Sequence, residues 1–222
     1  QMEDAQADST KSLPVYKEYP DGFKWVELKL PEKLDSKQAK QVRPAETKRG
    51  RGTEQDLYGY EAVDAQGKPL RNSYTNEIAG GKTPEEAWLA GRLAEEGNAM
   101  GHCVGGYCEG VAAGESKIYS LRDAKGKSHV TVEVQPEVTE KLARDSMQLH
   151  GDSVDANILQ IKGKQNRAPN AEYLPYVQDF VKSGKWGEVG DLENTGLLKS
   201  ARGEYLNTEE LSKRANTLSK AS

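Results

Sequence analysis

The sequence predicts an α+β protein: a small antiparallel sheet packed on two or three helices, with an N-terminal β-hairpin extension and flexible termini. Two observations support this fold class. Segments in which apolar and polar residues alternate are separated by short turn sequences, as in antiparallel strands. Segments with helical periodicity lie before and after these strands. With 35% hydrophobic and 30% charged residues over 222 positions, we expect one core with loosely packed appendages.

The N-terminal region predicts a leader followed by a hairpin. Residues 1–12 are polar and carry acids, which predicts a disordered leader and not a signal peptide. Region 13–82 follows. In it, residues 15–19 and 23–30 flank Pro20-Asp21-Gly22, a turn sequence, and therefore predict a β-hairpin.

A second hairpin is predicted further along the same region. Residues 58–63 and 70–74 flank Asp64-Ala65-Gln66-Gly67, which is another turn sequence. The two hairpins are expected to form an N-terminal extension or an extra β layer.

A basic segment at residues 36–53 lies between the hairpins. Six cations accompany a single acid there: Lys37, Lys40, Arg43, Lys48, Arg49, Arg51 and the acid Glu46. This composition predicts a solvated linker or a basic arm. A basic arm can bind phosphate without sequence specificity. A plain flexible loop is favoured, because no aromatic residue lies between the charges.

Residues 83–190 form the expected core, which opens with a strong helix start. Thr83 can cap the helix, Pro84 suits its first position, and Glu86 completes a capping box. Gly97 is the expected end of this helix. A second helix is expected over residues 101–113.

This second helix has an apolar stripe but contains several glycines. The stripe consists of Met100, Val104, Tyr107 and Val111. Gly105, Gly106 and Gly110 lie within the helix, and each costs about 0.5–1 kcal/mol relative to alanine. Close approach of a backbone or a ligand is one reason for such glycines, and an irregular segment is the alternative.

Strands and a last helix complete the core. Strands are expected at residues 118–122, 129–134 and 158–161, with a polar excursion at 135–156. A helix is expected at residues 171–183. The C-terminal tail, 191–222, is expected to hold one short helix with weak ties to the core.

The cysteine content indicates a reducing compartment. On a helix, Cys103 and Cys108 would lie about 7.5 Å apart along the axis, whereas disulfides need Cα atoms within about 7 Å. Free thiols are typical of the cytoplasm. Without a CxxC pair, two cysteines and three histidines predict no metal site, and we expect no cofactor. No apolar run approaches the roughly 18 residues of a membrane span.

The first candidate site centres on Cys103. A cysteine nucleophile needs a lowered pKa and a base within reach, and a helix start favours the thiolate. His102 is adjacent but would point away from the buried stripe on a regular helix. His129 is the other candidate base, and Gln160 or Asn166 is the candidate third group. The alternative, favoured on spacing alone, is that Cys103 is a small core residue.

A second candidate site follows the strand at residues 158–161. Lys162, Lys164 and Arg167 offer cations, and the neighbouring amides Gln160, Gln165 and Asn166 can donate and accept hydrogen bonds. These residues suit a phosphate or a nucleotide edge. A solvated turn capped by Asn166 is an equally good interpretation.

Four motifs in order resemble the PcfJ-like module of phages and conjugative plasmids. The first is Met100-Gly101-His102-Cys103-Val104-Gly105-Gly106-Tyr107. Strand 118–122 and a Thr-x-Glu strand at 131–133 follow. The last is a Gln-x-x-Gly-x-x-Asn element at Gln160, Gly163 and Asn166. The resemblance extends from about Trp88 to Trp186, and the hairpin at 19–28 is similar to a segment preceding the module in phage examples.

The resemblance implies a context more than a reaction, because the family has no settled activity. It implies a polyvalent or conjugative protein acting in DNA transfer, injection or host takeover in the host cytoplasm, with delivery from a virion as one route. The implied positions of interest are His102, Cys103, Tyr107, Gln160 and Asn166. His129 is not part of the family pattern.

Two functional hypotheses therefore stand. In the first, the module binds nucleic acid or a host or phage protein through residues 37–51 and 162–167, and the His102-Cys103 pair is structural. In the second, it is a cysteine-dependent hydrolase or transferase in which Cys103 attacks. The first is preferred.

Overall fold

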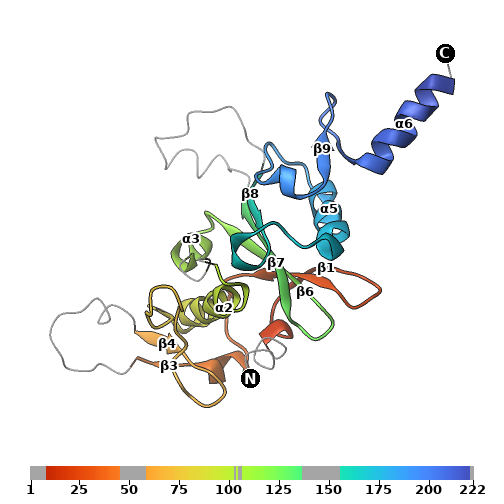
Figure 1. Cartoon of the computed structure of the whole chain (residues 1–222). Coiled ribbons are helices and arrows are strands. Elements are labelled where there is room, and N and C mark those ends of the chain that lie inside the picture. Colours follow the sequence, from red (N-terminus) through yellow and green to blue (C-terminus); the bar gives the residue numbers. More distant parts are fainter. Residues whose placement is uncertain (1–8, 46–58, 103, 105–106, 137–155, 221–222) are drawn as a thin grey trace, which may run out of the picture.

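The computed structural model describes residues 9–45, 59–102, 104, 107–136 and 156–220. Its centre is a five-stranded antiparallel sheet in the order β1-β2-β6-β7-β8 (Figure 1). The strands are β1 (Val15–Glu18), β2 (Lys24–Leu28), β6 (Lys117–Arg122), β7 (Ser128–Gln135) and β8 (Asn157–Lys162). Helices accompany the sheet, so the predicted α+β class is confirmed.

The N-terminal hairpin belongs to this central sheet. β1 and β2 pair across the predicted turn, where Gly22 takes the left-handed φ of +88° that glycine tolerates. β2 then pairs with β6, with Trp25 opposite Leu121. Of the two expected arrangements, an N-terminal extension or an extra β layer, this hairpin forms the extension, because it continues the central sheet and Trp25, Val26 and Leu28 are fully buried.

One face of the sheet packs against α5 (Leu174–Ser183), in agreement with the helix predicted at 171–183. Val177, Phe180 and Val181 of α5 are buried against Trp25 and other apolar residues of the strands. Each large apolar side chain buried in this way contributes about 1.5–3 kcal/mol to stability.

The other face packs against α2 (Pro84–Met100). The helix begins as predicted, because the Thr83 hydroxyl accepts a hydrogen bond from the Glu86 amide. It does not end at Gly97. It continues to Gly101, whose φ of +67° closes the helix. Burial of Met100, which is 1% exposed, outweighs the cost of about 1 kcal/mol for a glycine within the helix.

The second predicted helix is much shorter than expected. Only α3 (Cys108–Ala112) forms, and the described positions between Gly101 and Tyr107 are not part of an α-helix. The left-handed Gly101 breaks the helical path, so the predicted stripe does not lie on one regular helix.

A second, three-stranded sheet lies on the far side of α2 from the central sheet (Figure 1). It contains β3 (Val42–Pro44), β4 (Tyr60–Ala62) and β5 (Gly80–Gly81). A Cβ at Gly91 of α2 would lie 2.6 Å from the Ala62 Cβ, so this glycine permits close contact between helix and sheet. The turn predicted at residues 64–67 forms, but the arm predicted at 70–74 does not form a regular strand.

The expected basic linker at 36–53 is structured in its described part. Residues 38–41 form a short 3-10 helix that leads into β3. The Gln41 amide oxygen accepts hydrogen bonds from Trp88 and Arg92 at 2.8 and 3.0 Å. Lys48, Arg49 and Arg51 lie outside the described residues.

The two ends of the described chain differ. Ser9 and Thr10, expected in a disordered leader, are buried against the core. The C-terminal part forms a hairpin of β9 (Leu197–Lys199) and β10 (Tyr205–Asn207), then α6 (Thr208–Lys220), which projects from the body in Figure 1. None of the described helices has the length and apolar character needed to cross a bilayer.

Candidate functional site

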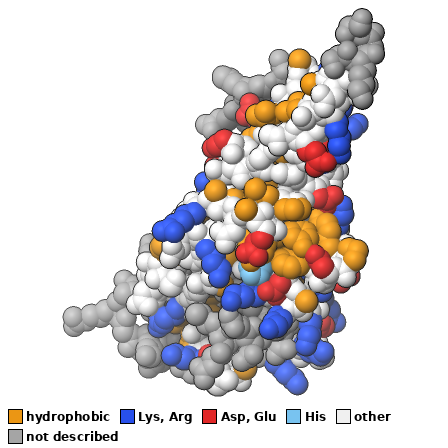
Figure 2. Space-filling view, turned by 45° about the vertical axis from the view of Figure 1, so that its right-hand side comes forward, with side chains coloured by type: hydrophobic (Ala, Val, Ile, Leu, Met, Phe, Trp, Pro, Cys, Tyr) orange, Lys and Arg blue, Asp and Glu red, His pale blue; other side chains and the backbone are white. Residues whose placement is uncertain are grey.

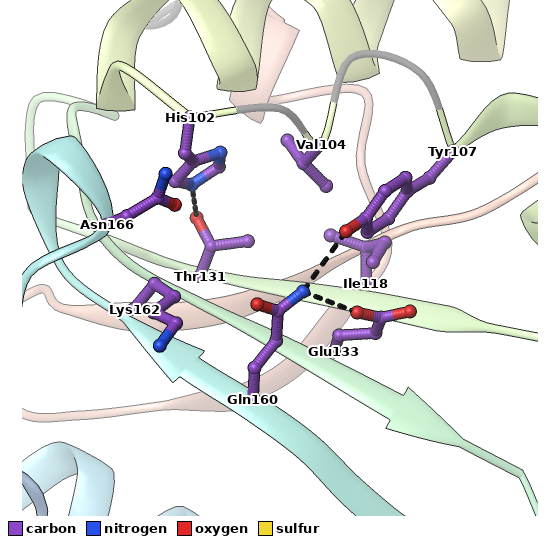
Figure 3. A pocket seen from close by; sticks show the side chains of 9 residues that line it. All are labelled: His102, Val104, Tyr107, Ile118, Thr131, Glu133, Gln160, Lys162 and Asn166. Carbon is purple, nitrogen blue, oxygen red and sulfur yellow. Dashed lines mark hydrogen bonds between the residues drawn. The ribbon is translucent and has the colours of Figure 1, made fainter. Parts of the chain in front are cut away.

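A small hollow lies where the end of α2 meets β7 and β8 (Figure 3). Its volume is about 20 Å³, which is room for one water-sized group. The residues that line it are His102, Val104, Tyr107, Ile118, Thr131, Glu133, Gln160, Lys162 and Asn166.

His102 enters this hollow because the chain turns at Gly101. The amides of Gly101 and His102 both donate to the Gly97 carbonyl, which ends α2 and directs the next side chain towards the sheet. His102 is only 4% exposed, and its Nε2 lies 2.9 Å from the Thr131 hydroxyl. The expectation that His102 points away from the core applied to a regular helix, and His102 instead lies in the non-helical segment after α2 with its ring buried.

Thr131 connects His102 to a fully buried carboxylate. The Thr131 hydroxyl donates to Glu96 Oε1 at 2.6 Å. Glu96 Oε2 accepts from the Ser128 hydroxyl at 2.6 Å and from Arg122 at 2.7 Å. Burial raises the pKa of Glu96, but the Arg122 charge and the hydroxyl donors outweigh burial, so the pKa is lowered and the carboxylate is ionised.

Arg122 holds this buried charge in place. Its remaining donors reach the Ser120 hydroxyl, the Thr10 hydroxyl and the Gly126 carbonyl at 2.8, 2.9 and 3.2 Å. A buried ion pair stabilises a structure only when such additional hydrogen bonds are made. The pair is therefore a rigid support for Thr131 and, through it, for His102.

The direction of these hydrogen bonds determines the tautomer of His102. A hydroxyl has one hydrogen, and that of Thr131 is donated to Glu96. Thr131 can therefore only accept from His102, so Nε2 carries the ring proton. In the neutral ring, Nδ1 then carries a lone pair. Nδ1 lies on the side of the His102 ring that faces Val104 (Figure 3).

His102 is held in its neutral form. Burial lowers the pKa of the ring, and the opposing effects of the Glu96 charge and the His102 backbone carbonyl do not offset it. A neutral imidazole with a directed lone pair can accept a proton or a hydrogen bond.

The opposite wall of the hollow is a hydrogen-bonded amide. Gln160 Nε2 donates to Glu133 at 2.6 Å and to the Tyr107 hydroxyl at 3.2 Å. Glu133 also accepts from the Ser116 hydroxyl at 3.1 Å. Gln160 is therefore fixed in orientation, and its amide hydrogens serve its protein partners.

Asn166 reaches the hollow from a strained loop. After β8 the chain turns at Gly163, where a Cβ would lie 2.9 Å from the Ala168 carbonyl oxygen. Gln165 and Asn166 both take a left-handed φ of 57°, which is costly for a residue other than glycine. This backbone directs the Asn166 amide towards His102 (Figure 3).

The structure thus places five of the predicted site residues around one hollow: His102, Tyr107, Gln160, Lys162 and Asn166. Cys103, Gly105 and Gly106 lie outside the described residues. The role of Cys103 as a nucleophile therefore stays a prediction. Cys108 is a free, partly buried thiol whose pKa burial raises to about 12, so it is not a nucleophile at neutral pH.

His129 does not belong to this hollow. The β6–β7 pairing shifts there, from Leu121 opposite Val130 to Arg122 opposite Ser128, so His129 sits in a bulge. Its ring stacks on Tyr173 and its Nε2 lies 2.8 Å from Asp123. His129 is therefore unsuited to act as base with the other predicted residues.

The predicted trio of loop cations is divided. Lys162 lines the hollow but forms an ion pair with Asp191 at 2.9 Å. Lys164 and Arg167 instead line a cleft of about 350 Å³. We call this the basic cleft; its lining residues are Lys127, His129, Lys164, Gln165, Arg167, Ala168, Asn170 and Tyr173.

The sequence interpretation missed the buried relay of Glu96, Arg122, Ser128 and Thr131. A signal for it exists. Glu96 stands on the buried side of α2 between Leu93 and Met100, where a carboxylate needs a partner. Arg122 likewise continues a strand whose side chains are buried.

Comparison with known proteins identifies a family that part of this chain matches. Residues 89–177 match the family described as PcfJ-like protein, in agreement with the resemblance read from the motifs. The matched segment covers less than half of the chain and contains the whole relay and the hollow. Neither the search of curated proteins nor that of solved structures found a match. Among the described residues, no group of three His, Cys, Asp or Glu side chains is placed to hold a metal ion.

Proposed function

We propose that this chain is a nucleic-acid-binding module of a phage or conjugative element, and that a single strand lies in the basic cleft. The observation that carries the proposal is the convergence of three cations on one cleft. Lys127 comes from the β6–β7 turn, and Lys164 and Arg167 come from the loop after β8. The two loops meet because β7 starts beside the end of β8, with Thr131 paired to Lys162.

The charge distribution supports a local phosphate site. The whole chain has a net charge of −4, so long-range attraction for a polyanion is weak and a local cluster must provide it. Figure 2 shows both basic and acidic side chains around a histidine ring, beside a hydrophobic patch. Lys164 and Arg167 are both exposed and can reach a phosphate.

The size and walls of the cleft favour a single strand over a duplex. A cleft of about 350 Å³ suits roughly one nucleotide unit. The stacked rings of His129 and Tyr173, 4.4 Å apart, form part of its wall. Proteins that bind single strands combine such rings with a cationic groove.

The context of a mobile element rests on the family match and on the motifs. The proposed roles are DNA transfer, injection or early host takeover in the host cytoplasm, including delivery from a virion. A free Cys108 is compatible with that reducing compartment.

Fluorescence anisotropy with a labelled single-stranded 12-mer tests the proposal. If three phosphates are neutralised, log K should fall with log salt concentration with a slope of about −2. The Lys164→Ala/Arg167→Ala variant should reduce the slope to about −0.7. Lys185→Ala removes an exposed cation outside the cleft and is the matched control. A salt-independent affinity, or equal effects of both variants, would contradict the proposal.

A second candidate function is thiol chemistry at Cys103, supported by the fixed tautomer of the preceding residue, His102. Iodoacetamide labelling between pH 5 and 9, in a Cys108→Ser background, measures the pKa of the Cys103 thiol. A pKa near or below about 6 supports a nucleophile. A pKa above about 8.5, or no labelling, removes the reason for this function.

A further inference from the structure

We infer that the hollow is a catalytic centre that cleaves the bound strand when the strand is RNA, with His102 as general base towards a ribose 2′-hydroxyl. The inference rests on the proposed function, because the basic cleft must hold the strand. It is carried by the relay behind His102 and by the loop that the hollow and the cleft share.

The relay prepares Nδ1 to accept a proton. Glu96 fixes the hydrogen of Thr131, Thr131 fixes the proton on Nε2, and the lone pair is left on Nδ1. When Nδ1 takes a proton, the imidazolium charge lies one hydroxyl away from the buried Glu96 carboxylate. An acid that orients a histidine and stabilises its imidazolium has this same role in hydrolase triads.

The size of the hollow selects a small nucleophile. Its volume of about 20 Å³ accepts one oxygen with its hydrogen, such as a sugar hydroxyl, but no base or phosphate. Asn166 is an exposed lining residue of the hollow, and its amide, which points towards His102, can donate to a phosphate oxygen placed beside that ring (Figure 3). The phosphate is therefore held beside Asn166 while the hydroxyl enters the hollow.

One loop connects the two sites. Asn166 lines the hollow, whereas its neighbours Lys164, Gln165 and Arg167 line the basic cleft. The left-handed backbone of Gln165 and Asn166 produces this division. A strand with one phosphate at Lys164 and Arg167 brings the adjoining nucleotide to Asn166, beside the hollow.

The step is a transesterification that needs no oxidant or second substrate. The 2′-hydroxyl gives its proton to Nδ1, and its oxygen forms a bond to the adjacent phosphorus. The bond from phosphorus to the 5′-oxygen breaks, and that oxygen takes a proton from solvent. The products are a 2′,3′-cyclic phosphate and a free 5′-hydroxyl, and His102 returns its proton to solvent.

The test uses the full chain and end-labelled 12-mers of RNA, of the matching DNA, and of RNA with 2′-O-methyl groups. His102→Gln is the decisive variant, because the glutamine amide can still donate to Thr131 while the Nδ1 base is lost. We expect the protein to cleave the unmodified RNA into products with cyclic phosphate ends, and to leave the DNA and the 2′-O-methyl RNA intact. We expect His102→Gln to cleave 10²–10⁴-fold more slowly, which is the usual contribution of a general base, with unchanged RNA affinity.

Thr131→Val tests the relay itself. Thr131 is a positioning residue, so its loss should lower the rate and move the acidic limb of the pH–rate profile to lower pH. Loss of the hydrogen-bonded link to Glu96 destabilises the imidazolium and lowers the pKa of His102. A merely structural role would leave the position of that limb unchanged.

The outcomes separate the two proposals. Wild-type protein that binds RNA without cleaving it, or His102→Gln that cleaves at the wild-type rate, overturns the catalytic inference and leaves the binding proposal standing. Lys164→Ala/Arg167→Ala should weaken both binding and cleavage. Wild-type protein that does not bind either strand overturns the binding proposal directly.

Discussion

The two faces of the central sheet are built from the same strands, but the face towards α5 packs through an apolar cluster, whereas the face towards α2 combines an apolar cluster with a buried ionic one. Towards α5, Val130 and Val132 of β7 join Trp25 and Phe180 in an apolar core. Towards α2, Thr131 of the same strand joins a buried ionic cluster. The apolar face extends across the sheet, whereas the polar cluster lies at the end of α2 that leads to the hollow.

This difference separates stability from positioning. Apolar burial stabilises the fold without specifying the orientation of any polar atom. A buried ion pair costs about as much in desolvation as it returns, but it orients each hydrogen-bonding group. Apolar burial on both faces therefore accounts for stability, and the ionic cluster on the α2 face accounts for the direction of the His102 lone pair.

Truncation of Phe180 should have the largest effect on the free energy of unfolding. Phe180 is fully buried between Trp25, Tyr119 and Trp186. Phe180→Ala should cost roughly 3–5 kcal/mol in urea denaturation. The control, Leu159→Ala, alters a residue that is 45% exposed and should cost under about 0.5 kcal/mol. Equal costs would mean that α5 does not anchor this face.

Replacement of Arg122 should have the second largest effect on the free energy of unfolding. Arg122→Met leaves the Glu96 charge without its ionic partner and should cost about 3 kcal/mol, the lower end for a broken buried pair, because two hydroxyl donors remain. Glu96→Met/Arg122→Met removes both charges and should recover at least half of that loss. If Glu96→Met/Arg122→Met is no more stable than Arg122→Met, removing the unpaired Glu96 charge brings no gain. The ion pair itself would then stabilise the fold.

Thr131→Val should lower the free energy of unfolding by less than Arg122→Met does. The valine keeps the shape but leaves a Glu96 oxygen and His102 Nε2 without a buried partner, which should cost about 1–3 kcal/mol. Ser36→Ala alters an exposed hydroxyl away from the relay and serves as comparison. A cost near zero would show that the hydroxyl does not connect the carboxylate to the ring.

A shift to mildly acidic pH should give the smallest change in the free energy of unfolding. The pKa of His102 is lowered in the folded state, so the unfolded chain binds more protons at this position and stability falls as pH drops through about 6.5, the ordinary histidine value. Between pH 7.5 and 5.5, the wild type should lose more stability than His102→Gln. Parallel losses would mean that burial does not hold this ring neutral.

Local signals predicted well those parts of the fold that depend on neighbouring residues. The capping box of α2 and the turn at Gly22 formed as expected, because their hydrogen bonds join residues only a few positions apart. The end of α2 was placed too early at Gly97. Tertiary burial of Met100 decided that boundary, and it is not visible in local sequence.

The site was predicted only in part for the same reason. Motif spacing grouped His102, Gln160 and Asn166 correctly around one hollow. The orientation of His102 could not be predicted, because it depends on Thr131, 29 positions away in the chain. His129 was misassigned because one bulge residue changes which face of the sheet a side chain occupies.

The left-handed pair at Gln165 and Asn166 has a consequence for any mutational survey of this chain. A substitution that relaxes either residue to an ordinary backbone conformation rotates the whole turn, so it displaces the amide at the hollow and the cations at the cleft together. Defects mapped to this turn will therefore register in both assays at once. Only side-chain changes that keep the backbone, such as Asn166→Asp, can assign a defect to one of the two sites.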